Sequence, residues 1–211
     1  MLTICCSVKG GSGTSVVAAL LALHPKRDTM LVDLDGDGPA VLGLTPPAGQ
    51  CLSDWFESDA PAAAVGTLAV DVDRTTQLVA RGTAAPDSTS SRWRDLAEWL
   101  AAPHPFHVIV DAGLGDPARL RPDDAGEARV LLVIRPCYLA LARAVAAGWR
   151  ADGVVLVHEP WRSLGPDDVE RALGVPVVAR LEHDPAIARA VDAGLAVARL
   201  PRAAQRLHLA A

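Results

Sequence analysis

A glycine-rich loop near the start of the chain, residues 9–15 (KGGSGTS), has the residue types that bind phosphate. It lies between two apolar runs, 2–8 and 16–23, whose lengths suit a strand and a helix. Glycines let the backbone turn with its N–H groups facing inward, and the positive end of the following helix points at the same place. The loop therefore predicts a phosphate site, with the Ser15 hydroxyl placed where such loops bind Mg²⁺.

Two other stretches place carboxylates where a phosphate site would use them. The apolar run 29–34 is followed by Asp35, and the run 106–110 is followed by Asp111. Acidic residues at the carboxyl ends of parallel strands face the crevice in which open α/β sheets bind ligands. An Asp that closes an apolar strand and precedes glycines is typical of the Walker B position, which holds Mg²⁺, usually through water. We therefore predict Ser15 and Asp111 as metal partners.

The loop KGGSGTS resembles the deviant Walker A motif, KGGxGK[ST], of the ParA/MinD family of P-loop ATPases in the SIMIBI class. It departs from that motif at Thr14, where the family has its P-loop lysine. Further stretches resemble the family in the same order along the chain. They are 31–44 (LVDLDGDGPAVLGL), 106–117 (FHVIVDAGLGDP), 135–144 (RPCYLALARA) and 182–201 (EHDPAIARAVDAGLAVARLP).

The resemblance implies a homodimeric switch that binds ATP and Mg²⁺. It implies that Lys9 reaches across the dimer to the partner's nucleotide and that Asp35 helps to place the attacking water. The implied nucleotide-binding residues are Gly10, Gly11, Ser12, Gly13, Thr14, Ser15 and Arg135. Because Thr14 replaces the lysine, we expect weak or absent hydrolysis. His158 stands where the family usually has the Asn that reads adenine, so the resemblance is broken there as well.

The alternation of apolar strands with helical stretches predicts the fold. Nearly every expected strand is continuously apolar, so both of its faces are buried. We predict one doubly wound α/β domain over 1–211, with a mostly parallel sheet of about seven strands flanked by helices. The chain length fits one domain. Residues 57–75 give the weakest pattern.

Composition indicates a cytoplasmic protein. No apolar run reaches the roughly 18 residues of a membrane span, and the N-terminus lacks the basic region of a signal peptide. The four cysteines have no metal-binding spacing. Residues 112–211 carry 13 arginines against 12 acidic residues, spread evenly, which leaves DNA binding open without a basic cluster to support it. The C-terminal stretch 201–211 is amphipathic but offers only two leucines, which argues against a membrane anchor.

Three classes of function fit the sequence. The first is a nucleotide-dependent switch that positions chromosome, plasmid, division or pilus machinery through a protein partner. The second is a nucleotide-independent scaffold, like the degenerate TadZ/CpaE pilus-assembly proteins. The third is a dinucleotide-dependent oxidoreductase, because Gly11 and Gly13 followed by an acidic residue echo the GxGxxG pattern. Val16 occupies the position of the third glycine in that pattern, which disfavours the third class.

Overall fold

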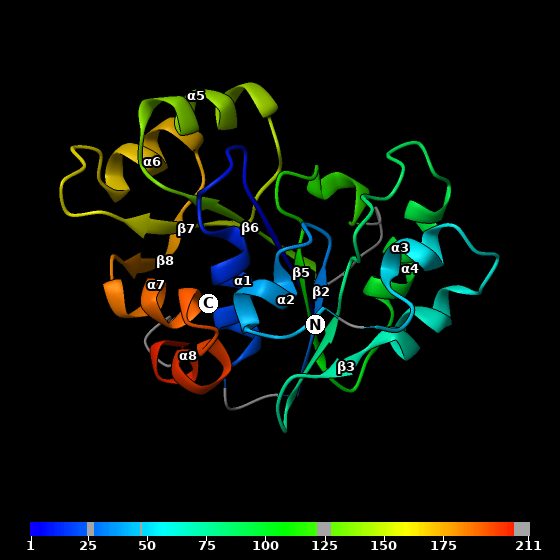
Figure 1. The fold of residues 1–211 in the computed structure, drawn as a ribbon. Coiled ribbons are helices and arrows are strands. Elements are labelled where there is room, and N and C mark those ends of the chain that lie inside the picture. The colour runs from blue at the N-terminus through cyan, green and yellow to red at the C-terminus, as the bar shows by residue number, and fades with distance from the viewer. Residues whose placement is uncertain (25–27, 47, 122–127, 205–211) are drawn as a thin grey trace.

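The computed structural model describes residues 1–24, 28–46, 48–121 and 128–204 (Figure 1). They form an eight-stranded sheet in the order β3-β4-β2-β5-β1-β6-β7-β8. Every strand pairing is parallel except that of β3 with β4, which is antiparallel. The predicted doubly wound, mostly parallel α/β sheet is confirmed. The sheet has one strand more than the predicted number. The additional strand is β3, a two-residue edge strand in the segment whose sequence pattern is weakest.

The strands coincide with the apolar runs of the sequence. Their bounds are β1 Leu2–Cys6, β2 Thr29–Asp33, β3 Val70–Asp71, β4 Thr76–Val79, β5 His107–Asp111, β6 Ala128–Ile134, β7 Gly153–His158 and β8 Val177–Glu182. Strand β1 lies in the middle of the sheet, between β5 and β6, and all five of its residues are buried. Its central place explains why its sequence is apolar on both faces.

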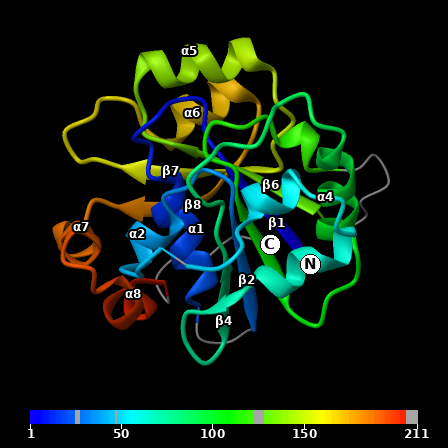
Figure 2. The ribbon, with the colours of Figure 1, turned by 45° about the vertical axis from the view of Figure 1, so that its right-hand side comes forward.

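Helices cover both faces of the sheet. Their bounds are α1 Thr14–Ala22, α2 Gly38–Leu42, α3 Leu52–Phe56, α4 Arg92–Ala101, α5 Tyr138–Ala147, α6 Pro166–Leu173, α7 Pro185–Asp192 and α8 Ala196–Ala204. Two 3₁₀ helices, η1 Ala62–Leu68 and η2 Pro117–Arg119, complete the described elements. Figures 1 and 2 show α5 and α6 on one side of β7 and β8, with α7 and α8 on the other side.

The hydrophobic core has two parts, one on each face of the sheet. Neighbouring residues of β1 belong to different parts. Ile4 belongs to the part that contains residues of α3 to α6, and Cys5 belongs to the part that contains residues of α1, α2, α7 and α8. Helix α1 is apolar around its circumference because it is buried between the sheet and the helices α2 and α8. The glycine loop is thus fixed between a central strand and a buried helix.

Local signals explain where several helices begin. Helices α6 and α7 start with proline in the first turn, where its missing N–H costs nothing. Asp168 Oδ2 accepts a hydrogen bond from Gly165 N at 2.9 Å, and Asp184 Oδ1 accepts one from Ala186 N at 2.8 Å. No helix in the described ranges is long and apolar enough to cross a membrane. Of the predicted amphipathic stretch 201–211, residues 205–211 lie outside the described residues.

Candidate functional site

The glycine loop turns sharply between β1 and α1. Gly11 and Gly13 have φ angles of 74° and 91°, a left-handed conformation that favours glycine. The Ser12 hydroxyl donates to the carbonyl oxygen of Lys9 at 2.7 Å and closes the turn. A Cβ atom on Gly11 would meet nothing within 4 Å, so its glycine is required by the backbone angle and its outer face stays open to a ligand.

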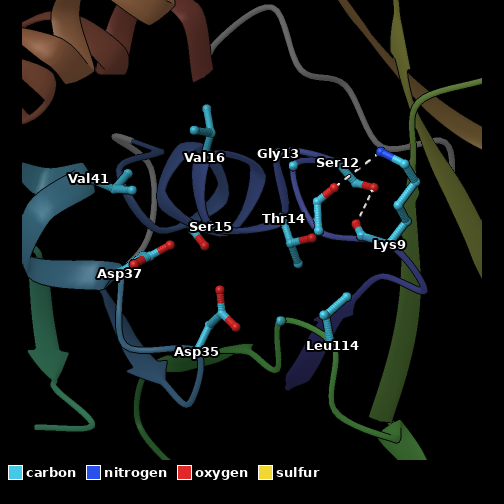
Figure 3. Close-up of a pocket in the computed structure, with 13 residues that line it drawn as sticks. Lys9, Ser12, Gly13, Thr14, Ser15, Val16, Asp35, Asp37, Val41 and Leu114 are labelled. Carbon is cyan, nitrogen blue, oxygen red and sulfur yellow. Dashed lines mark hydrogen bonds between the residues drawn. The ribbon is translucent and has the colours of Figure 1, made fainter. Parts of the chain in front are cut away.

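The loop forms one wall of a cavity of about 190 Å³ (Figure 3). Its lining consists of residues 9–16, Asp35, Asp37, Val41, Gly113 and Leu114. Pockets for whole drug-sized ligands have volumes of roughly 300–1,000 Å³. This cavity therefore suits the phosphate part of a nucleotide, with the base lying outside it.

Asp35 faces Ser15 across the cavity (Figure 3). It is carried on the loop after β2, which Asp33 holds by accepting hydrogen bonds from Gly36 N at 2.6 Å and Gly38 N at 3.0 Å. A Cβ atom on Gly113 would collide with the Asp35 carboxylate, so the loops after β2 and β5 touch at this point. Burial and the nearby Asp37 raise the pKa of Asp35, while Arg81 and the Ser15 hydroxyl lower it.

Asp111 closes β5 beside Asp33, its partner in the neighbouring strand. Its Oδ1 accepts a hydrogen bond from Gly113 N at 3.1 Å, whereas its buried Oδ2 has no hydrogen-bond partner in the described part of the chain. Burial raises its pKa to about 7, and the Ser15 hydroxyl opposes this rise. A buried carboxylate oxygen without a donor costs free energy unless a cation or proton meets it.

These features fit a magnesium ion held jointly by protein and phosphate. No group of three or more His, Cys, Asp or Glu side chains among the described residues could hold a metal ion alone. Mg²⁺ commonly binds through one or two protein groups together with phosphate oxygens and water. The Ser15 hydroxyl, which lines the cavity, and Asp111 Oδ2, which has no hydrogen-bond partner among the described residues, are protein groups of this kind. Asp111 does not itself line the cavity, but Ser15 lies near enough to lower its pKa.

Solved structures with the same fold are readily found, although the sequence matches no protein-family model and no curated protein. MinD of Pyrococcus horikoshii, solved with Mg-ADP, has a TM-score of 0.75 and 20% identity over 97% of this chain and 91% of its own. A ParA family ATPase of Chlorobium tepidum has a TM-score of 0.69 and 18% identity over 98% and 99% of the two chains.

A chain of the MinC:MinD cell division protein complex of Aquifex aeolicus has a TM-score of 0.71 and 15% identity, over 97% of this chain and 94% of its own. This chain has the fold of the MinD and ParA ATPases. The fold that the motifs implied is thereby confirmed across nearly the whole chain.

Two further predicted residues lie at the cavity of this MinD/ParA fold. Thr14 is the first residue of α1 and is only 7% exposed. The motif that the loop resembles has its lysine at this position, and here the side chain is small and neutral. Lys9 lines the cavity too, but its Nζ donates to the carbonyl oxygen of Gly10 at 3.3 Å and turns back over its own loop (Figure 3). Among the described residues, Lys9 is the one lysine that lines the cavity.

Arg135 does not line the cavity of this MinD/ParA fold. Its Nη1 lies 3.4 Å from Oε1 of Glu159, whose Oε2 accepts a hydrogen bond from Arg162 Nε at 2.6 Å. Glu159 is buried, and its pKa is lowered chiefly by the hydrogen bond from Arg162. His158 Nδ1 lies 2.7 Å from Oε2 of Glu182. Arg135 and His158 are therefore engaged by carboxylates at the ends of β6, β7 and β8.

Two residues that contact the loop carrying Asp35 are not among the predicted site residues. Asp33 lies within the stretch 31–44 that resembles the family, without a predicted role of its own, yet it fixes the loop that carries Asp35. Arg81, from the segment after β4, lies against Gly36 on the same loop. Its place after an apolar strand is the one signal that could have indicated it, and many arginines share that signal.

Proposed function

We propose that the protein is a nucleotide-dependent switch of the ParA/MinD type, with residues 1–211 acting as one domain. It binds ATP with Mg²⁺ and, as a nucleotide-bound homodimer, positions a cellular cargo through a protein partner. The cargo is chromosome, plasmid, division or pilus machinery. The observation that carries the proposal is the glycine-loop cavity. Ser15 lines it and also lowers the pKa of Asp111, whose buried Oδ2 has no hydrogen-bond partner among the described residues.

Each site residue has one task in this proposal. The N–H groups of residues 10–14 and the start of α1 bind the phosphates. Ser15 and Asp111 hold Mg²⁺, and Asp35 orients the attacking water. When bound, the nucleotide supplies a γ-phosphate whose presence or absence distinguishes two states of the protein.

We further propose that hydrolysis is weak or absent. Thr14 offers a neutral hydroxyl where a cation would stabilise developing charge, and Arg135 is paired with Glu159. P. horikoshii MinD with Mg-ADP and the A. aeolicus MinC:MinD complex support a nucleotide ligand and a protein partner for this fold.

The test is a titration with fluorescent ATP, in Mg²⁺ and in chelator. We expect saturable binding that requires Mg²⁺ and is lost in Gly11→Ala, because an L side chain is strained at that φ angle. Gly174→Ala is the matched control, since Gly174 has a φ angle of 65° with open space around it and lies at the end of α6. Equal binding by both variants would contradict the proposed site.

A second candidate is the nucleotide-independent scaffold. Thr14 in place of the lysine and the pairing of Arg135 and His158 with carboxylates favour it. It predicts that neither ATP nor NAD binds at any Mg²⁺ concentration. Binding of NAD alone would point instead to a dinucleotide oxidoreductase.

A further inference from the structure

Arg81 stands on a rigid segment directly after β4. The carbonyl oxygens of Ala80 and Arg81 accept hydrogen bonds from Leu52 N at 2.9 Å and Ser53 N at 2.8 Å, at the start of α3. Gly82 follows with a φ angle of 90°, and a Cβ atom there would collide with Ser53. The backbone that carries the Arg81 side chain is thus fixed from both sides.

The Arg81 guanidinium covers the backbone of Gly36, in the loop that carries Asp35. A Cβ atom on Gly36 would collide with Nη2, Cζ and Nε of Arg81, and Gly36 has a φ angle of 98°. Arg81 Nε is buried and has no hydrogen-bond partner within the described ranges. Arg81 is also absent from the ion pairs found there. Its charge is therefore held beside the loop without being committed to one carboxylate.

The surroundings of this guanidinium are strongly acidic. Asp33, Asp35 and Asp37 lie on the loop, and Asp111 lies beside Asp33 across the sheet. Arg81 is the basic residue that lowers the pKa of both Asp33 and Asp35. Lys9, which lines the cavity, turns its Nζ to the Gly10 carbonyl, whereas Arg81 does not line the cavity. A phosphate chain in the cavity would thus face Asp35 and Asp37, with Arg81 packed against the loop that carries them.

We propose that Arg81 is a positioning residue, whose guanidinium holds the Asp33–Gly38 loop with Asp35 facing the cavity and offsets the repulsion between this loop and bound phosphates. The first half concerns the ligand-free protein. The second half rests on the proposed nucleotide function. With Thr14 in place of the lysine of the motif, Arg81 would act on the site through the loop and not by lining the cavity.

The first half is tested by amide hydrogen exchange at Gly36 and Gly38, the donors to Asp33, without ligand. Arg81→Met removes the charge at similar length, and we expect both amides to exchange about tenfold faster. Arg81→Lys keeps a cation and should retain most of the protection. Arg94→Met is the control, because Arg94 is exposed on α4 and its one ion pair among the described residues is with Glu98, at 4.0 Å. Unchanged exchange in Arg81→Met would overturn the positioning role.

The second half is tested by ADP affinity in the same variants. We expect Arg81→Met to bind ADP roughly three- to tenfold more weakly and Arg81→Lys to stay within about twofold of the wild type. Equal loss in both variants would show that packing, not charge, matters, and would overturn this half. If Arg81→Met does not fold, Arg81→Gln is used instead, because it removes the charge but keeps a polar side chain. A wild type that binds neither ATP nor ADP would refute the proposed function, while the exchange experiment still decides the positioning role.

Discussion

Thr14 is the residue that most separates this site from the motif it resembles. It lies buried at the start of α1 and lines the cavity, so its hydroxyl can reach a ligand there. A hydroxyl donates one neutral hydrogen bond, whereas a lysine places a full positive charge on the phosphates. The backbone N–H groups of the loop remain in either case, so binding should suffer less than hydrolysis.

Thr14→Lys should therefore restore hydrolysis. Removal of one preorganised group that stabilises developing charge costs about 10²–10³ in rate, so we expect a gain of that order in phosphate release. The dissociation constant for ATP should change less. Thr67→Lys adds the same charge at an exposed position and should leave the rate unchanged. Brisk hydrolysis by the wild type would instead mean that another cation already serves the phosphates.

The buried Asp111 makes stability depend on pH. Its pKa of about 7 lies above that of an unfolded Asp, near 3.9, so the unfolded chain loses this proton first as pH rises. The free energy of unfolding should fall between about pH 4 and pH 7 in ligand-free protein with chelator. Asp111→Asn should remove this fall and be more stable than wild type at pH 8 by about 1–4 kcal/mol. Urea titrations at about pH 4.5 and about pH 8 measure the free energy of unfolding near the two ends of this range. Asp59→Asn, at an exposed position, is the control.

The same carboxylate should carry the Mg²⁺ dependence of nucleotide binding. Asn keeps an acceptor oxygen for Gly113 N but has no charge for the ion. We expect Asp111→Asn to bind ATP with equal affinity in Mg²⁺ and in chelator, as measured by fluorescence titration. A preserved Mg²⁺ effect would give Asp111 a structural role only.

At the scale of elements, the site depends on contacts between loops that follow neighbouring strands. Ser7 N donates to the carbonyl oxygen of Gly113 at 2.7 Å, and Leu34 N donates to that of Asp111 at 2.9 Å. These bonds tie together the loops after β1, β2 and β5. The glycine loop, Asp35 and Asp111 are thus brought to one edge of the sheet by parallel pairing of three central strands.

Gly113→Ala tests this arrangement. Gly113 has a φ angle of 53°, and an added Cβ atom would collide with Asp35. We expect a loss of about 1–3 kcal/mol in the free energy of unfolding, measured in urea, together with weaker ATP binding. Gly148→Ala has a similar φ angle of 62° with open space, so it should show the backbone strain without the collision and keep ATP binding. Equal effects in both variants would remove Asp35 from the explanation.

Much of the fold could be predicted because its strands are continuous apolar runs, as in β1 and β6. The segment 57–75 could not, because η1 is a 3₁₀ helix and β3 has two residues, too few to show a period. The loop and strand-end carboxylates of the site follow from motif and strand order. The pairing of Arg135 with Glu159 and the contact of Arg81 with Gly36 depend on tertiary placement, which no local pattern encodes.

At the scale of the whole molecule, three large apolar side chains are exposed in the segments that follow β5, β6 and β7. Leu114, which lines the cavity, is 56% exposed. Tyr138 and Trp161, which follow the carboxyl ends of β6 and β7, are 84% and 65% exposed. All three follow carboxyl ends of parallel strands, so we expect them to share the cavity's edge of the sheet. In the proposed dimer this edge would face the partner subunit.

Lys9→Ala tests the proposed dimer. Lys9 lines the cavity, and the one hydrogen bond of its Nζ within the described ranges goes to the nearby Gly10 carbonyl, so the side chain can turn towards phosphates of a partner subunit. A charge-assisted hydrogen bond contributes about 1.5–3 kcal/mol, and a symmetric dimer contains the bond twice. Light scattering should show that the molar mass of the wild type doubles when ATP and Mg²⁺ are added. Lys9→Ala should stay monomeric at the same concentration. Arg74→Ala, which removes an exposed cation elsewhere, should dimerise normally. If the wild type keeps one mass with and without ATP, Lys9 has no role across a dimer.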